Sequence, residues 1–163
     1  MPSVSVPLKG EPGWDRLMRQ RRAFWRKPGH SQLTPHFRAQ EFYTHDGSAC
    51  PVLARPGMVA LCKVFLEPMR AKFGTCLVLS GYRHERYNQA IGGARHSQHI
   101  YEHDFESVAA DLRFARGNPR EWAEYAKKLR STKRGGKGGV GLYTRSGFVH
   151  VDNRNYQADW QGN

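Results

Sequence analysis

The sequence Phe148-Val149-His150-Val151-Asp152 alternates apolar valines with two side chains that can carry chemistry. A period of two is typical of a β-strand, on which His150 and Asp152 share one face. Residues 140–143 precede this segment across the turn 144–147, so the two segments are predicted to form a β-hairpin. The hairpin therefore presents a histidine and an aspartate on one face of a sheet.

Further elements can be predicted on both sides of this hairpin. Apolar runs predict strands at 76–80 and 109–114. A 3.6-residue period predicts helices over 56–73, ended by Gly74, and over 119–130, with a shorter helix at 87–91 and a Gly/Lys loop at 132–139. Because strands and helices do not alternate regularly, we expect an α+β fold with a small, mainly antiparallel sheet and flanking helices.

The chain divides into two parts of unequal character. Its 163 residues suffice for one compact domain, expected over 33–163, after a basic N-terminal arm over 1–32. The arm holds the basic run 16–27, in which Leu17, Met18, Phe24 and Trp25 recur at helical spacing. Two interpretations are open: a solvated helix that packs one face on the domain, or an arm that binds anionic cell-wall polymers or nucleic acid.

Composition limits the partners and the compartment. The formal net charge of +12 favours anionic polymers, but no nucleic-acid recognition motif accompanies it, so nucleic acid is not the expected partner. Cys50, Cys62 and Cys76 are too far apart for a Cys-x-x-Cys pair and are expected to be core residues. No signal-peptide core or membrane span is evident, which predicts synthesis in the cytoplasm.

Three potential metal ligands lie in short, well-defined sequence contexts. His99 ends Ser97-Gln98-His99, Asp111 ends Ala109-Ala110-Asp111, and His150 lies in the strand quoted first. Two imidazoles and one carboxylate suit a zinc ion that keeps one open position for a reactive water. Arg83, shortly upstream, could bind a carboxylate or carbonyl oxygen of a substrate.

These motifs together resemble the zinc D-Ala-D-Ala carboxypeptidase family, which includes L-Ala-D-Glu endopeptidases of phage endolysins and shares its fold with the Hedgehog signalling domain. The resemblance covers about residues 33–162. It implies that His99, Asp111 and His150 bind Zn²⁺ and that Arg83 orients the substrate or stabilises the transition state. The motifs that carry it are Ser80-Gly81-Tyr82-Arg83, Asn88, Gly92-Gly93-Ala94, Ser97-x-His99, Ala109-Ala110-Asp111 and Phe148-Val149-His150-Val151-Asp152.

The spacing departs from the family pattern in one place. Family members have only a few residues between the first histidine and the aspartate, whereas residues 100–108 are inserted here. His103 would restore a shorter spacing to Asp111 but lacks the Ser-Gln-His context. We therefore prefer His99 as the first ligand.

The expected function is a zinc metallopeptidase that hydrolyses peptidoglycan stem peptides, as a carboxypeptidase or an endopeptidase. The protein is expected to act on the cell wall, after lysis or as part of a phage particle, and to be phage-derived. The alternative is a non-catalytic zinc-containing module that binds the cell wall. A proton-transfer group beside the metal would distinguish an enzyme from such a module.

The sequence lacks the family's usual candidate for the catalytic base. Relatives commonly place an acid three positions before the last histidine, where this chain has Gly147. Asp152 is the candidate, either as the base or as a group that orients His150 and raises its basicity. Glu102, His103 and Glu106 of the inserted segment are outside candidates.

Overall fold

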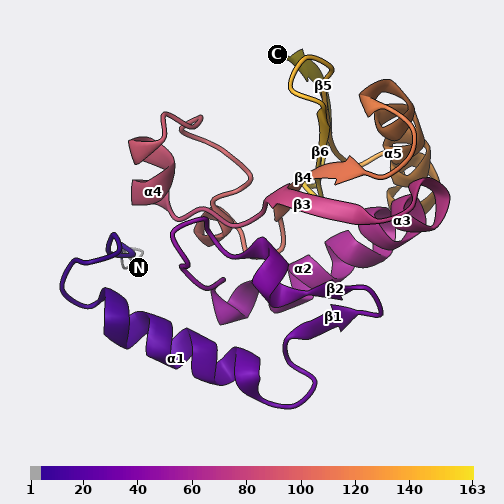
Figure 1. The fold of residues 1–163 in the computed structure, drawn as a ribbon. Helices are drawn as coiled ribbons and strands as arrows, with labels where there is room; N and C mark the ends of the chain where they lie inside the picture. The colour runs from indigo at the N-terminus through magenta and orange to yellow at the C-terminus, as the bar shows by residue number, and fades with distance from the viewer. Residues whose placement is uncertain (1–4) are drawn as a thin grey trace.

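A five-stranded sheet organises the C-terminal half of the chain (Figure 1). The structure is a computed structural model that describes residues 5–163. The strands follow the spatial order β3-β4-β6-β5-β7, and every neighbouring pair is antiparallel except β5 with β7. This arrangement confirms the predicted α+β fold. The strands are β3 (Cys76–Ser80), β4 (Ala109–Phe114), β5 (Gly138–Tyr143), β6 (Phe148–Asp152) and β7 (Gln157–Gly162).

One face of this sheet is apolar and is covered by a helix. Ala110 and Leu112 of β4 and Val149 and Val151 of β6 are fully buried on it. Helix α5 (Pro119–Arg134) packs against this face and contributes Trp122. Asn118 caps the start of α5, and Gly135, in the left-handed conformation, ends it four residues later than predicted. Because side chains alternate along a strand, Asp111 and His150 lie on the opposite face.

The predicted helix over 56–73 is interrupted in its hydrogen bonding. Helix α2 (Arg55–Leu61) continues into a π-helical segment, Cys62–Leu66, and then into α3 (Glu67–Phe73), which ends at Gly74. Pro68, at the start of α3, has no N–H to donate. The wider turn just before this residue lets the chain continue as a helix without that bond.

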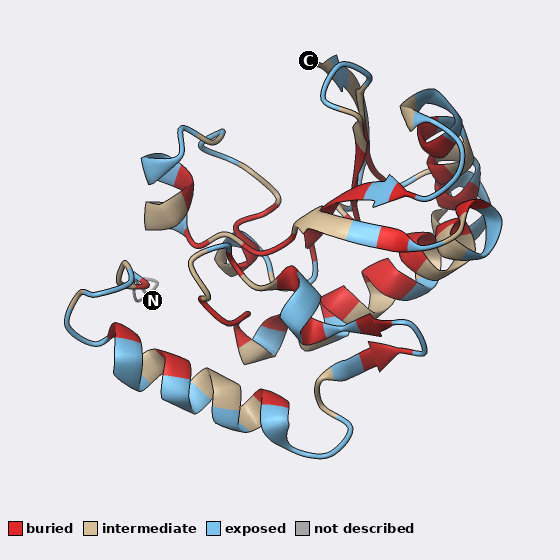
Figure 2. Cartoon of the chain, in the orientation of Figure 1, coloured by how far each residue is buried: buried red, intermediate tan, exposed pale blue. Residues whose placement is uncertain are grey.

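The N-terminal helix α1 (Trp14–Arg26) packs one side on the rest of the molecule (Figure 2). Trp14, Met18 and Trp25 are buried in the common core, and Trp25 donates from Nε1 to the carbonyl of Cys50 at 3.0 Å. The packed helix matches one of the two interpretations of the basic run. The division of the chain at residue 33 stays a prediction.

The remaining elements are short. A hairpin of β1 (Gln32–Thr34) and β2 (Phe37–Arg38) follows α1, and α4 (Glu85–Ala90) lies between β3 and the loop that carries His99. Single 3₁₀ turns occur at Ala39–Phe42, Val52–Ala54 and Tyr101–His103. All three cysteines are buried and form no disulfide. In residues 5–163, no helix has the length and apolar character that crossing a bilayer requires.

Candidate metal centre

Asp111 and His150 are direct partners on neighbouring antiparallel strands. The register of β4 with β6 pairs Asp111 with His150 and Ala109 with Asp152. Paired side chains on antiparallel strands point to the same face, so the carboxylate and the imidazole meet above the sheet. Nδ1 of His150 lies 3.0 Å from Oδ1 of Asp111.

His99 approaches the same carboxylate from a loop. Its Nδ1 lies 2.6 Å from the carbonyl oxygen of Gly81, and its own carbonyl accepts the backbone N–H of Arg83 at 2.8 Å. Because the Gly81 carbonyl can only accept, Nδ1 carries a proton, and Nε2 is the nitrogen left to bind a metal ion. Nε2 lies 3.3 Å from Oδ1 of Asp111. The ring is thus held with Nε2, the nitrogen available to a metal ion, facing the carboxylate.

Gly81 makes this orientation possible by having no side chain. A Cβ at this position would lie 2.8 Å from the Cα of Phe42. Glycine therefore lets strand β3 leave the sheet closely enough to Phe42 for the Gly81 carbonyl to reach His99.

The three side chains fit a metal ion by geometry and by chemistry. One potential ligand atom from each of His99, Asp111 and His150 lies within 4.8 Å of the others, and all three residues are buried. Two imidazole nitrogens and one carboxylate oxygen form the donor set of an open tetrahedral zinc site. The group could therefore hold a metal ion, as predicted from the sequence.

The pKa shifts of His150 and Asp111 also indicate a site that favours a positive charge. Burial alone would lower the pKa of His150, but hydrogen bonds to Asp111 and Asp152 outweigh it and raise the pKa to about 9. Burial likewise opposes ionisation of Asp111, yet the charges and hydrogen bonds of His99 and His150 hold its pKa well below the usual range. The site thus attracts a positive charge between the two rings and the carboxylate.

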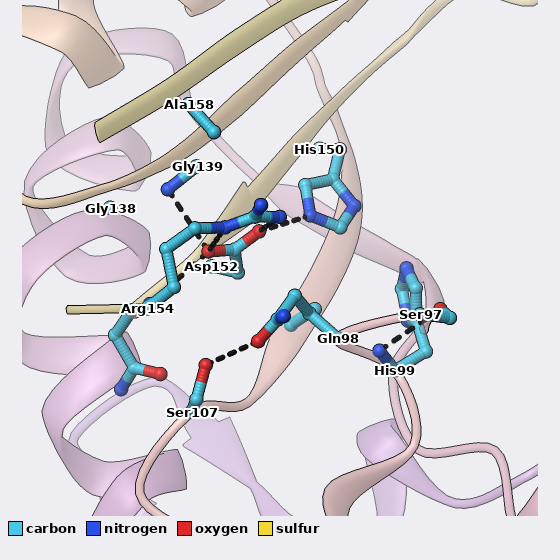
Figure 3. A network of polar contacts seen from close by, with 12 residues as sticks. Ser97, Gln98, His99, Ser107, Gly138, Gly139, His150, Asp152, Arg154 and Ala158 are labelled. Carbon is cyan, nitrogen blue, oxygen red and sulfur yellow. Dashed lines mark hydrogen bonds and ion pairs between the residues drawn. The ribbon is translucent and has the colours of Figure 1, made fainter. Parts of the chain in front are cut away.

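Asp152 lies between His150 and Arg154, and its carboxylate contacts both side chains (Figure 3). Oδ2 accepts from Nε2 of His150 at 2.8 Å and from Arg154 Nη2 at 2.6 Å. Oδ1 accepts from Arg154 Nε at 2.7 Å and from the Gly139 N–H at 3.0 Å. Although burial would raise the pKa of Asp152, these donors lower it far below normal. Both oxygens are occupied, and the side chain is fully buried.

A cavity of about 470 Å³ opens above the three ligands. Arg83 lies on its wall, with Nε donating to Ser80 Oγ at 3.1 Å and Nη2 3.8 Å from Oδ2 of Asp111. The opposite wall is aromatic: the Trp160 ring centroid lies 4.9 Å from that of His150, and Trp160 donates to the Tyr143 hydroxyl at 2.8 Å. Arg83 follows β3 and Trp160 lies in β7, the two outer strands of the sheet, so a cationic and an aromatic part of the wall lie on either side of the potential ligands.

The outside candidates for the base do not line this cavity. Glu102 accepts from the Tyr82 hydroxyl and pairs with Arg21, and His103 and Glu106 line neighbouring hollows. Instead the cavity wall includes His96, which the sequence did not single out, and Arg154, which holds Asp152. The order His150-x-Asp152-x-Arg154 on and after one strand was the signal that could have revealed Arg154.

Comparison with known proteins gives one match. A family model described as Peptidase M15 matches residues 35–152, which include Arg83, the three potential ligands and Asp152. Helix α1 and strand β7 lie outside the matched range. No curated protein and no solved structure matches the chain.

Proposed function

Because this chain belongs to the peptidase M15 family, we propose that it is a zinc-dependent peptidase that cleaves peptidoglycan stem peptides. The observation that carries the proposal is the convergence of His99, Asp111 and His150 at the base of a cavity that also presents Arg83. A zinc ion held by two imidazoles and a carboxylate supplies a water nucleophile at neutral pH and polarises the scissile carbonyl. The phage origin expected from the sequence stays a prediction.

Each ligand has a defined donor atom in this proposal. His99 would bind through Nε2, because its Nδ1 donates to Gly81. His150 would bind through Nδ1, because its Nε2 donates to Asp152. A histidine ligand whose second nitrogen donates to a carboxylate is fixed in orientation and is more basic. These contacts support His99, rather than His103, as the first ligand.

Arg83 is the proposed substrate-binding residue. Its backbone N–H and its Nε are both held, by His99 and Ser80, so the outer guanidinium nitrogens are positioned over the cavity. A fixed guanidinium can bind a substrate carboxylate or stabilise the oxyanion that forms as the peptide carbonyl is attacked.

We assign Asp152 the role of positioning His150, the second of the two roles that the sequence left open. A general base must reach the proton that it removes, directly or through one water. Asp152 is fully buried, does not line the cavity and accepts hydrogen bonds at both oxygens. The imidazole of His96, on the cavity wall, is the group that we propose as the proton acceptor.

Digestion of purified muropeptides tests the proposed function. The zinc-loaded protein should release defined products, identified by mass, and both Asp111→Ala and chelator treatment should abolish them. Product masses also distinguish a carboxypeptidase from an endopeptidase. Binding of muropeptides without any product would instead establish a non-catalytic wall-binding module.

A further inference from the structure

The inserted segment 100–108 is fastened to the domain at both ends. At its start, the Ile100 N–H donates to the Ser97 carbonyl at 3.1 Å. At its end, the Val108 N–H donates to Oδ1 of Asn153 at 2.7 Å, and the Asn153 side chain also donates to the Gly57 carbonyl at 3.0 Å. Between these anchors His103, Asp104 and Glu106 are exposed. The inserted segment is therefore fixed by hydrogen bonds at both ends and exposes part of its surface to solvent.

Two further cavities lie between the metal cavity and the inserted segment. A second cavity, of about 110 Å³, shares Ser97, Gln98 and Arg154 with the metal cavity. A third, of about 350 Å³, shares Asp104, Ser107 and Asn155 with the second. Because neighbouring cavities share lining residues, the three cavities lie in a row that leads from the three potential ligands along the inserted segment, and we call this row the path.

A side-chain hydrogen bond lies beside the second cavity, where it adjoins the metal cavity. Gln98 accepts a hydrogen bond from the Ser107 hydroxyl, so the residue next to His99 is joined to the inserted segment (Figure 3). Ser107 is buried, whereas Asn155, which lines the same two cavities, is exposed. Within residues 5–163, the Asn155 side chain forms no hydrogen bond, so its amide is available to a ligand. Amides and hydroxyls of this kind suit the alternating donors and acceptors of a peptide backbone.

The charged residues along the path favour one orientation of a bound peptide. Near the metal ligands the wall carries the guanidinium of Arg83, which favours a substrate carboxylate. At the far end the cavity is lined by two carboxylates, those of Asp104 and Glu106, and by one guanidinium, that of Arg134, which donates to backbone carbonyls. A carboxyl-terminal end is repelled there, whereas the amino-terminal part of a peptide is not.

We propose that the inserted segment and residues 153–156 form a subsite for the amino-terminal part of the substrate peptide. The substrate is then an extended stem peptide rather than a free dipeptide. This inference rests on the proposed function and adds the direction in which the peptide lies. Binding energy gained along this path can accelerate cleavage at the metal centre, although no group there touches the scissile bond.

The test compares a dipeptide with peptides extended at the amino end, for the parent protein and for Asn155→Trp. This exposed position allows a large side chain to block the path without disturbing the core. The parent should cleave the extended peptides with a kcat/KM about tenfold higher or more. Asn155→Trp should lose that gain and cleave the dipeptide normally. Lys133→Trp, exposed on α5 and away from the three cavities, is the matched control.

A binding experiment distinguishes failure of the subsite from failure of the proposed peptidase function. Peptide is added to the protein, and the NMR chemical shifts of the Asn155 side-chain amide are measured. Cleavage that does not depend on amino-terminal length, with no shift at Asn155, would overturn the subsite and leave the peptidase intact. Shifts at Asn155 that saturate with the extended peptide, without cleavage of any peptide, would overturn the peptidase and leave the subsite intact. Equal effects of the two tryptophan variants would also refute the subsite.

Discussion

Nε2 of His150 lies 2.8 Å from Oδ2 of Asp152, on the side of the imidazole away from Asp111. This contact makes Asp152→Asn the most informative substitution in the site. If Asp152 positions His150, zinc affinity should fall about 10- to 100-fold while kcat at saturating zinc stays close to normal. Equilibrium zinc titration and kinetics at saturating zinc measure the two effects separately.

Asp15→Asn, at an exposed position on α1, is the matched control for this substitution and should change neither quantity. A large loss of kcat in Asp152→Asn with zinc fully bound would show that Asp152 is the base. The assignment of His96 would then fail as well.

Removal of any one ligand should remove the metal. We expect His99→Ala, Asp111→Ala and His150→Ala each to lose bound zinc and activity, because two ligands do not hold zinc against water and competing chelators. His103→Ala should keep one zinc per chain, measured by elemental analysis. Full zinc in His99→Ala combined with loss in His103→Ala would move the first ligand into the inserted segment.

Zinc affinity should rise with pH. Without metal, both nitrogens of His150 face carboxylates, and its pKa is raised to about 9. Below that pH the proton on Nδ1 must leave before the metal binds, so affinity increases as pH rises and levels off above pH 9. The expected slope is about tenfold per pH unit. Calorimetry in buffers of different ionisation enthalpy should show about one proton released; zinc binding without proton release contradicts the assignment.

His96→Gln should slow catalysis without affecting the metal. A general base contributes about 10²- to 10⁴-fold, so kcat should drop by at least about 100-fold while zinc content is unchanged. His36→Gln is the control, because His36 is an exposed histidine that pairs with Glu67 away from the cavity. An unchanged kcat in His96→Gln would exclude its role as the base.

The exposed arginines of α1 should bind anionic wall polymers. Arg16, Arg19 and Arg26 are exposed, whereas Arg21 donates to the Ala49 carbonyl and Arg22 to the Gly47 carbonyl. Replacing the three exposed arginines by glutamine should weaken wall pull-down and flatten its salt dependence, because screening acts over about 8–10 Å. Cleavage of a small peptide should not change. If the triple variant were pulled down by cell walls as well as the parent protein, the exposed arginines of α1 would not be the wall-binding residues.

The sequence predicted those elements whose local hydrophobic pattern matches the contacts that they make in the fold. The strand that carries Val149 and Val151 alternates cleanly, and Asp111 and His150 lie in contexts that fix their face of the sheet. Strand β7 was missed because its sequence, Gln157–Gly162, has no β-branched residue and no buried position: exposed and half-buried residues alternate along it. It is a strand because it pairs along β5, a tertiary contact that local pattern does not record.

The residues around the three potential ligands were harder to predict than the group of three itself. Arg154 holds Asp152, although an arginine after a strand is ordinarily a solvated charge. The inserted segment gave no signal of order, since the residues that bind it, Ser97, Gln98 and Asn153, lie outside it in the sequence. Contacts between distant residues determine which polar groups are buried, and a single sequence does not reveal them.

The pairing of Asp111 with His150 ties metal binding to strand alignment. Slippage of β6 by one residue would turn His150 to the apolar face and bring a valine opposite Asp111. An ion shared by β4, β6 and the His99 loop would then act as a clamp on this alignment, closing chain loops of 12 and 39 residues. The same ion would select the correct pairing during folding, because a slipped sheet has no site to offer it.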